Sequence, residues 1–218
     1  MPLASQIVLE PRKSPVQARS TASVEAILVA TIQVLVAIGK ERLTTTRVAE
    51  RAGVSVGTLY QYFPNKSALL QAALKRHLDS VADAVEQACR EQHGSTLQEM
   101  ASALITAFLA AKMKKAKISA ALYSISSDID GFKIVKQMGA RTNKAITEML
   151  ASASEPLSKD PQIVASMLQD AMVGIARRMI ESGTPEKNLE PYRQELIFLA
   201  SAYLQACTAQ EPIPAHKR

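Results

Sequence analysis

Residues 44 to 66 constrain the fold of this chain more than any other stretch, because they have the pattern of two short helices joined by a tight turn. Val48 and Ala49 begin a small apolar face on the first helix. Gly53 follows at a position where the end of a helix favours a residue that accepts a positive φ. Ser55 can then cap a second helix. The pattern predicts helices over residues 45–52 and 56–63.

The second of these helices has one side for burial and a defined end. Leu59 and Phe63 lie four residues apart and therefore share a face, and Pro64 ends the helix. The arrangement matches a helix-turn-helix, whose second helix lies in the DNA major groove. The alternative is an ordinary corner between two helices with half-buried tyrosines.

The polar side of the second helix indicates how DNA would be contacted. Short or amide side chains suit base edges and thymine methyl groups, and the candidates are Val56, Gly57, Thr58 and Gln61. Phenolic hydroxyls and an ammonium suit phosphates, which set the register on the duplex, and the candidates are Tyr60, Tyr62 and Lys66.

These positions belong to a longer string that resembles the DNA-binding signature of the TetR/AcrR family of bacterial one-component repressors. The string covers about the first 70 of the 218 residues and consists of Arg19, the apolar helix 24–36, Gly39, Thr44, Thr45, Val48, Ala49, residues 52–55, residues 57–60, Tyr62, Phe63, Asn65, Lys66, Leu69 and Leu70. The resemblance implies an all-helical homodimer that binds an operator and is released by a small ligand. It adds Arg19, Thr44, Thr45, Thr46 and Ser55 to the DNA-contacting candidates, although some relatives have a long polar residue where Thr46 stands.

Positive charge is concentrated in the same part of the chain. Residues 1–66 carry eight Lys and Arg against four Asp and Glu, whereas residues 67–218 carry eighteen against sixteen. Attraction to phosphates explains this distribution. Arg12, Lys13 and Arg19 precede the first helix on an arm, residues 1–20, that is predicted to be flexible and able to reach the DNA backbone. A merely solubilising tail explains Arg12 and Lys13 equally well.

Other sequence features exclude several classes of protein. No glycine-rich phosphate loop, metal-ligand cluster or nucleophile–base arrangement is recognisable, so we expect neither an enzyme nor a bound cofactor or metal. Cys89 and Cys207 are expected to be buried, reduced thiols of a cytoplasmic protein. The richest apolar stretch, residues 27–38, is interrupted by polar residues and short for a membrane span, and no signal peptide is recognised.

The rest of the chain is predicted to be helical. Helices are expected at about 21–38, 67–92, 95–113, 116–125, 127–152, 161–182 and 189–208, with a capping box at residues 95–98, Asp160 before Pro161 as a start and Gly183 as a cap. His77 is expected to be a core histidine, and the lysines 112, 114, 115 and 117 a solvated helix end. The predicted architecture is all-α, with the helix-turn-helix domain at residues 21–66, a ligand-binding and dimerisation domain at 67–208 and a flexible tail at 209–218.

The last two predicted helices are apolar over much of their circumference, so one side is available to a partner. They resemble the pair that forms the dimeric four-helix bundle of the TetR family. The candidate interface residues are Ile175, Met179, Phe198 and Tyr203. A two-fold dimer suits a pseudo-palindromic operator with two half-sites.

The central helices mix apolar and hydroxyl side chains, as a small-molecule pocket requires, although plain core filling explains each residue as well. The candidate pocket residues are Phe108, Met113, Tyr123, Phe132, Met138 and Met172. Together, these patterns predict a DNA-binding transcriptional repressor that a small, largely apolar molecule releases from its operator. A structural scaffold would explain the helices but not residues 44–66.

Overall fold

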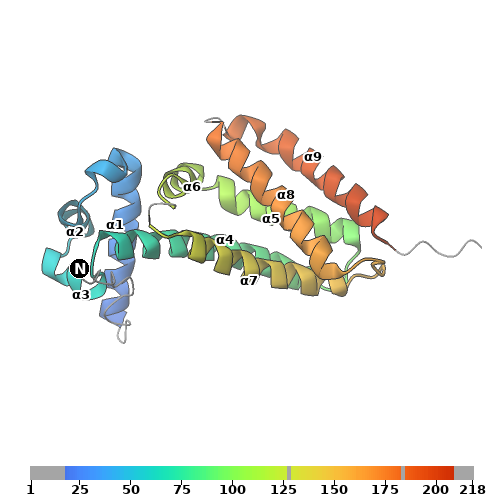
Figure 1. The fold of residues 1–218 in the computed structure, drawn as a ribbon, viewed down its shortest axis with the longest axis horizontal. Coiled ribbons are helices and arrows are strands. Elements are labelled where there is room, and N and C mark those ends of the chain that lie inside the picture. Colours follow the sequence, from blue (N-terminus) through green and yellow to red (C-terminus); the bar gives the residue numbers. More distant parts are fainter. Residues whose placement is uncertain (1–17, 127–128, 183–184, 209–218) are drawn as a thin grey trace, which may run out of the picture. The chain divides into compact units, whose positions relative to one another are not determined.

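The computed structural model describes residues 18–126, 129–182 and 185–208, and this part of the chain is helical (Figure 1). The helices are α1 Ala18–Arg42, α2 Thr45–Ala52, α3 Val56–Tyr62, α4 Lys66–Glu91, α5 Leu97–Met113, α6 Ala116–Tyr123, α7 Phe132–Ala151, α8 Pro161–Glu181 and α9 Pro185–Ala206. Within the described ranges a single isolated bridge, Leu157 with Thr208, has β geometry. The predicted all-α class is confirmed.

The helices divide into two compact units. The first contains the chain up to Asp79 together with Lys117–Gln137, and the second contains Ser80–Ala116 and the chain from Met138 onward. Helices α4 and α7 therefore contribute to both units. The division differs from the boundary expected at residue 66, because the first half of α4, α6 and the segment after α6 belong to the first unit.

Contacts between α4 and this segment explain its place in the first unit. The side-chain amide of Gln71 donates to the carbonyl oxygen of Ile129 over 2.5 Å. His77 is 4% exposed and its Nε2 lies 2.9 Å from the hydroxyl oxygen of Ser119, so the expected core histidine is confirmed. A Cβ on Gly131 would lie 2.7 Å from the backbone oxygen of Ser126 and 2.8 Å from Leu74, so glycine allows the backbone to approach closely here.

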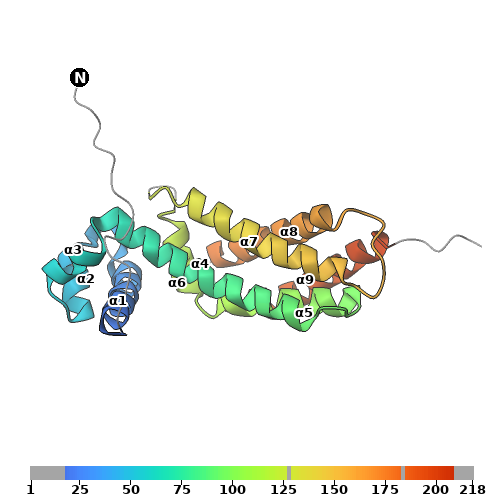
Figure 2. The same ribbon diagram turned by 90° about the horizontal axis from the view of Figure 1, so that it is seen from below.

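The core of the first unit lies between α1 and the two helices of the motif. Ile27, Leu59 and Phe63 are at most 1% exposed. Gly39 interrupts α1 close to its end, because its backbone (φ 75°, ψ 170°) is not helical. Glycine accepts this positive φ since it has no Cβ. Figure 2 shows α2 and α3 packed beside α1.

Helix α1 is also the one described helix that is long and apolar enough to cross a membrane, by length and composition over Ser20–Arg42. The apolar stretch of residues 27–38 is short for a membrane span, but the helix extends beyond it at both ends. Its Ile27, Ile32 and Leu35 are at most 7% exposed, which is the behaviour of a core helix.

Several helix boundaries differ from the prediction by a local shift. Thr96, not Ser95, caps α5, and it forms the capping box with Glu99, because the hydroxyl of Thr96 accepts from the backbone N–H of Glu99. The backbone N–H of Thr96 donates to Glu99 in return, which lowers the pKa of that carboxyl. Helix α7 begins at Phe132, after Asp130 with φ 53°.

The start of α8 is as predicted: the Asp160 carboxylate accepts from the backbone N–H of Gln162 over 2.9 Å, with Pro161 in the first turn. The predicted cap Gly183 lies outside the described residues. In the second unit an ion cluster joins α7 to α4, where Arg141 of α7 binds both Glu86 and Asp83 of α4.

Two polar features of the second unit are buried. Lys112 is 4% exposed and its ammonium lies 6.0 Å from the centre of the Phe108 ring, so the expectation of a solvated lysine cluster is wrong at this position. Lys114, Lys115 and Lys117 are exposed. Cys89 and Cys207 are buried free thiols, and burial raises the pKa of the Cys89 thiol to about 12, which makes it unreactive at neutral pH.

Candidate nucleic-acid interface

The turn between α2 and α3 has the geometry expected from its residues. The Thr44 hydroxyl caps α2 by accepting from the backbone N–H of Arg47 over 3.3 Å. Gly53 adopts the left-handed conformation (φ 68°, ψ 30°) that ends α2. Ser55 caps α3 by accepting from the backbone N–H of Thr58 over 2.9 Å. The side chains of Thr44 and Ser55 thus act first as helix caps.

Burial on α3 separates an inner from an outer side. Leu59 and Phe63 are at most 1% exposed, which anchors the helix in the unit. The outer side consists of Val56, Gly57, Tyr60 and Gln61, which are exposed, with Thr58 and Tyr62 half-buried at its edges. Six of the predicted DNA-contacting residues therefore lie on or beside one accessible helix face.

Gly57 has no structural reason to be glycine. It lies within α3, without a positive φ, and a Cβ built on it would have Ser55 Oγ at 3.7 Å as its nearest neighbour, which is ordinary van der Waals contact. Alanine in a helix is more stable than glycine by about 1 kcal/mol. The absence of a side chain is therefore better explained by a partner that approaches this face closely.

Two threonines at the start of α2 lie next to this face. The hydroxyl of Thr45 lies 3.0 Å from that of Tyr60, which joins the first turn of α2 to α3. Thr46 is exposed. The side chain of Arg19 is outside the described residues, as is the arm before residue 18, so the predicted contacts from them remain predictions.

Lys66 lies elsewhere than expected. Its ammonium donates to the backbone carbonyl of Lys40 over 2.8 Å in a part-buried position. Lys40 lies in the last turn of α1, just after the interruption at Gly39, and a cation is favourable near the carbonyl end of a helix. We therefore revise its role from a phosphate contact to a cap of α1.

Lys66→Ala should lower the stability of the first unit by about 1.5 kcal/mol, because it removes a hydrogen bond from a charged donor. The log–log salt slope of DNA binding should stay unchanged, since no phosphate contact is lost. Chemical denaturation followed by circular dichroism, together with DNA titrations at several salt concentrations, measures both quantities. A slope reduced by about one, with unchanged stability, would restore the phosphate role.

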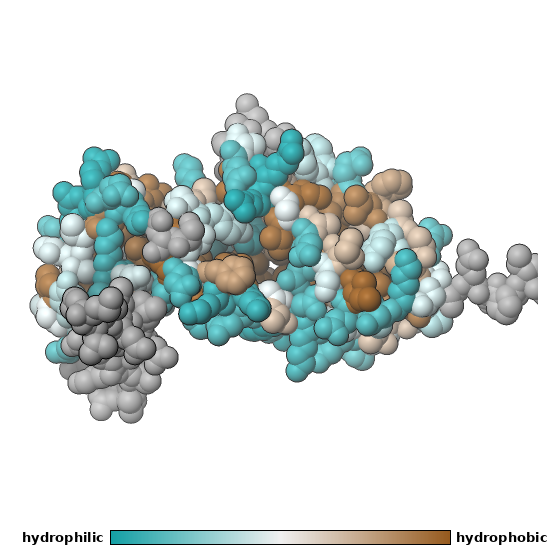
Figure 3. Space-filling model, viewed as in Figure 1, coloured by the Kyte–Doolittle hydropathy of each residue, from teal (hydrophilic) through white to brown (hydrophobic). Residues whose placement is uncertain are grey.

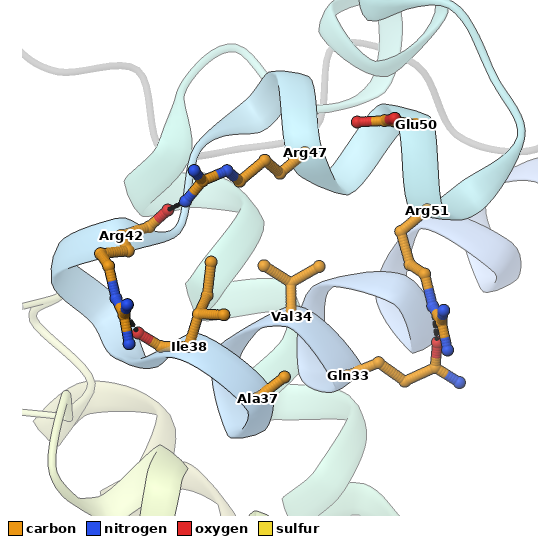
Figure 4. Close-up of a pocket in the computed structure, with 8 residues that line it drawn as sticks. All are labelled: Gln33, Val34, Ala37, Ile38, Arg42, Arg47, Glu50 and Arg51. Atoms are coloured by element: carbon orange, nitrogen blue, oxygen red, sulfur yellow. Dashed lines mark hydrogen bonds between the residues drawn. The ribbon is translucent and has the colours of Figure 1, made fainter.

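A hollow between α1 and α2 was not anticipated from the sequence. It has a volume of about 720 Å³ and is lined by Gln33, Val34, Ala37, Ile38, Arg42, Arg47, Glu50 and Arg51 (Figure 4). The apolar side chains of α1 lie between Arg42 and Arg47 at one end and Arg51 at the other. The four-residue spacing of Arg47 and Arg51 was the available sequence signal. We call this hollow the α1–α2 groove.

The predicted pocket residues do not form one described cavity. Phe108, Met113 and Met172 are buried in the second unit, and Met138 is half-buried there. Met172 lines a very small cavity between α5, α8 and α9, with a volume of about 10 Å³. Tyr123 belongs to the first unit, as does Phe132. Phe132 is 72% exposed, so its assignment to an enclosed pocket is wrong in this structure.

The predicted dimer residues fall into two groups. Phe198 is 71% exposed, and Ile175 and Tyr203 are half-buried. Met179 is 2% exposed, so the core of its own subunit already covers it and its assignment to the interface is wrong. The exposed apolar side chains of α8 and α9 are instead Ile163, Met167, Val173, Tyr192, Phe198 and Leu199. Figure 3 shows hydrophobic surface over these two helices.

In the described part of the chain, no group of three or more His, Cys, Asp or Glu side chains is placed to hold a metal ion. The described structure has a helix α3 that is capped and exposed on one side, together with a second helical unit. Together they define a helix-turn-helix DNA-binding protein.

Comparison with known families identifies the family of DNA-binding proteins to which the chain belongs. Residues 27–73 match the model described as bacterial regulatory proteins, tetR family, and residues 96–204 match the tetracyclin repressor-like C-terminal domain. The chain belongs to the TetR family of DNA-binding transcriptional regulators and is not an enzyme.

Individual relatives agree with this assignment over limited lengths. The chain is 47% identical to the HTH-type transcriptional repressor KstR of Mycolicibacterium smegmatis over 55 residues, 25% of this chain and 27% of that protein. It is 41% identical over 64 residues to the transcriptional activator FasR of the same organism, 29% of each protein. The chain thus matches less than a third of the length of these curated relatives.

Solved structures share the fold over most of the chain. A TetR-family regulator from Mesorhizobium loti superposes with a TM-score of 0.74 at 17% identity, covering 88% of this chain and 100% of the other. SmeT, the repressor of a Stenotrophomonas maltophilia multidrug efflux pump, superposes with a TM-score of 0.62 at 20% identity, covering 90% and 96%. At these identities the likeness concerns the fold alone.

Proposed function

We propose that this regulator is a cytoplasmic repressor that binds a pseudo-palindromic operator as a homodimer, with α3 of each subunit in the major groove. The observation that carries the proposal is the outward face of α3. Gly57 has no side chain there, although the chain itself leaves room for one. Close approach to the groove floor explains the absence of a side chain. Thr45, Tyr60 and Tyr62 are assigned to the phosphates on either side.

The dimer is assigned to the exposed apolar side chains of α8 and α9. Ile163 and Met167 lie four residues apart on α8 and are 59% and 56% exposed, and Phe198 and Leu199 on α9 are 71% and 51% exposed. Covering such side chains removes apolar surface from water, which is favourable by about 25 cal/mol per Å². The same surface on two copies can pair about a two-fold axis.

Release by a small, largely apolar molecule is proposed to occur through the second unit. Most of its buried side chains are apolar or soft, and methionines such as Met113 and Met172 adapt to irregular ligands. The space beside Met172 is below the size of a usual ligand pocket, so binding there requires side chains to move. The ligand then shifts the equilibrium toward a conformation with lower operator affinity.

Repression, rather than activation, is supported by the relatives named as repressors, KstR and SmeT, against FasR, which is named an activator. The test is selection of bound duplexes from a random pool, followed by anisotropy titration of the selected site. We expect two inverted half-sites about one helical turn apart or more. A selected site without two-fold symmetry would contradict the dimeric model, and no enrichment would contradict DNA readout by α3.

A further inference from the structure

The α1–α2 groove has chemistry that the DNA-binding role does not use. Its floor is apolar and is formed by Val34, Ala37 and Ile38 of α1. Val34 and Ile38 are half-buried, and Ala37 is exposed. The groove is open on one side, so a small molecule in it would stay largely solvated, whereas a macromolecular surface could cover it.

Three guanidinium groups line the groove, and each donates a hydrogen bond to an oxygen of the chain. The Nε of Arg42 donates to the carbonyl of Ile38 over 3.2 Å, and the Nη1 of Arg47 donates to the carbonyl of Arg42 over 2.8 Å. The Nε of Arg51 donates to the side-chain oxygen of Gln33 over 2.7 Å. Figure 4 shows these three bonds at the rim.

The positive charge of the rim is not neutralised. Each of the three bonds uses one of the five N–H donors of a guanidinium, and each acceptor is an uncharged oxygen. Among the described residues, the ion pairs within 4.0 Å do not include Arg42, Arg47 or Arg51. Glu50 is the one carboxylate in the lining. Held guanidinium forks with free donors are suited to carboxylates.

The spacing of these groups suits a helix as the occupant. Arg47 and Arg51 lie four residues apart on α2, roughly 6 Å along its axis. Two glutamates four residues apart on another helix have the same spacing. The apolar side of such a helix would lie on Val34 and Ile38, as when amphipathic helices bind in grooves.

DNA fits the groove less well. Phosphates gain nothing from an apolar floor. Successive residues of a helix are rotated by about 100°, so Arg51 points roughly 140° away from Thr46, which lies on the side of α2 assigned to DNA. The chain's own ends also lack the matching charge, since residues 1–17 and 209–218 each contain one acidic and two basic residues.

We propose that the α1–α2 groove is a docking site for an acidic amphipathic helix of a partner protein. The arginines bind carboxylates at both ends of the groove, and the floor of α1 covers the apolar side of that helix. Because the groove and the outward side of α3 are formed by different residues, the regulator can bind such a partner while it is on DNA.

The test uses the full chain and a fluorescein-labelled synthetic helix of about 15 residues, with leucines along one side and glutamates four residues apart beside them. A peptide of the same composition in scrambled order is the control. Anisotropy should show saturable binding of the ordered peptide and at least tenfold weaker binding of the scrambled one. Equal binding of both peptides would overturn the proposal, as would no binding of either.

Variants of the protein locate the site. Arg51→Gln should weaken peptide binding at least threefold, and the further change Arg47→Gln at least tenfold, because each removes a charged donor. Ala37→Glu, at an exposed position of the floor, should weaken it similarly by repulsion. Lys75→Gln, which removes an exposed charge of the same unit outside the groove, should leave it unchanged.

Two further measurements test whether DNA or a small amphiphile, and not a helix, occupies the groove. For Arg51→Gln, operator affinity should stay within twofold of the parent and the salt slope should stay unchanged. A slope lowered by about one would assign the arginines to DNA phosphate instead. Sodium dodecanoate should not displace the peptide below its micelle concentration. Displacement would assign the groove to a small anionic amphiphile and overturn the proposal. Thermal melts confirm that each variant is folded.

Discussion

Phe198→Asp should convert the regulator from a dimer into a monomer at micromolar concentration. The side chain is 71% exposed on the isolated subunit, so a charge there costs the fold of the subunit little. At a dimer interface the same carboxylate is buried without a partner, at a cost of roughly 3–5 kcal/mol per copy. Two-fold symmetry applies this cost twice, and every 1.4 kcal/mol changes the dissociation constant about tenfold.

Sedimentation equilibrium measures this effect directly, and three controls make the result specific. Phe198→Leu keeps an apolar side chain and should remain dimeric, as should Ala110→Asp, which places a charge at an exposed position of α5. Met179→Asp should unfold the subunit, because Met179 is 2% exposed within it. If Phe198→Asp sediments as a dimer, the interface lies on another face; if the parent protein is a monomer, the dimeric model fails.

Gly57→Glu should abolish specific operator binding while leaving the fold intact. The position is exposed, and a carboxylate in the first turn of α3 is favoured by the helix dipole, so folding is not expected to suffer. Against the major groove the same charge faces phosphates and base acceptors without a partner. The cost should exceed roughly 1.4 kcal/mol, which is more than tenfold in affinity.

Gly57→Ala is the matched control for this prediction. The added methyl group finds ordinary contact distances inside the chain, so thermal stability should be unchanged or higher. Operator affinity should also fall in Gly57→Ala, but by less than in Gly57→Glu. Anisotropy with the selected operator, beside a melt of each variant, gives both values. Operator binding by Gly57→Glu within threefold of the parent would move base readout away from this end of α3.

Local chemistry explains what could be predicted from the sequence. Gly53 ends α2 because of its positive φ, Ser55 caps α3 through its own hydroxyl, and Asp160 with Pro161 starts α8. Each of these effects depends on residues within one helical turn of each other, so the sequence contains the information. The same holds for the buried side of α3, since Leu59 and Phe63 are four residues apart.

Tertiary structure decided the features for which two distant segments must meet. Lys112 is buried although its lysine neighbours are exposed. Lys66 caps α1 by donating to the carbonyl of Lys40, which lies 26 residues earlier in the chain. Met179 and Phe198 are both apolar, yet one lies in the core of its subunit and the other on its surface. Periodicity alone shows that a helix has an apolar side, but not which neighbour covers it. The sequence therefore determined the helices and the DNA-reading motif, whereas packing decided which of its charged and apolar side chains remain available to partners.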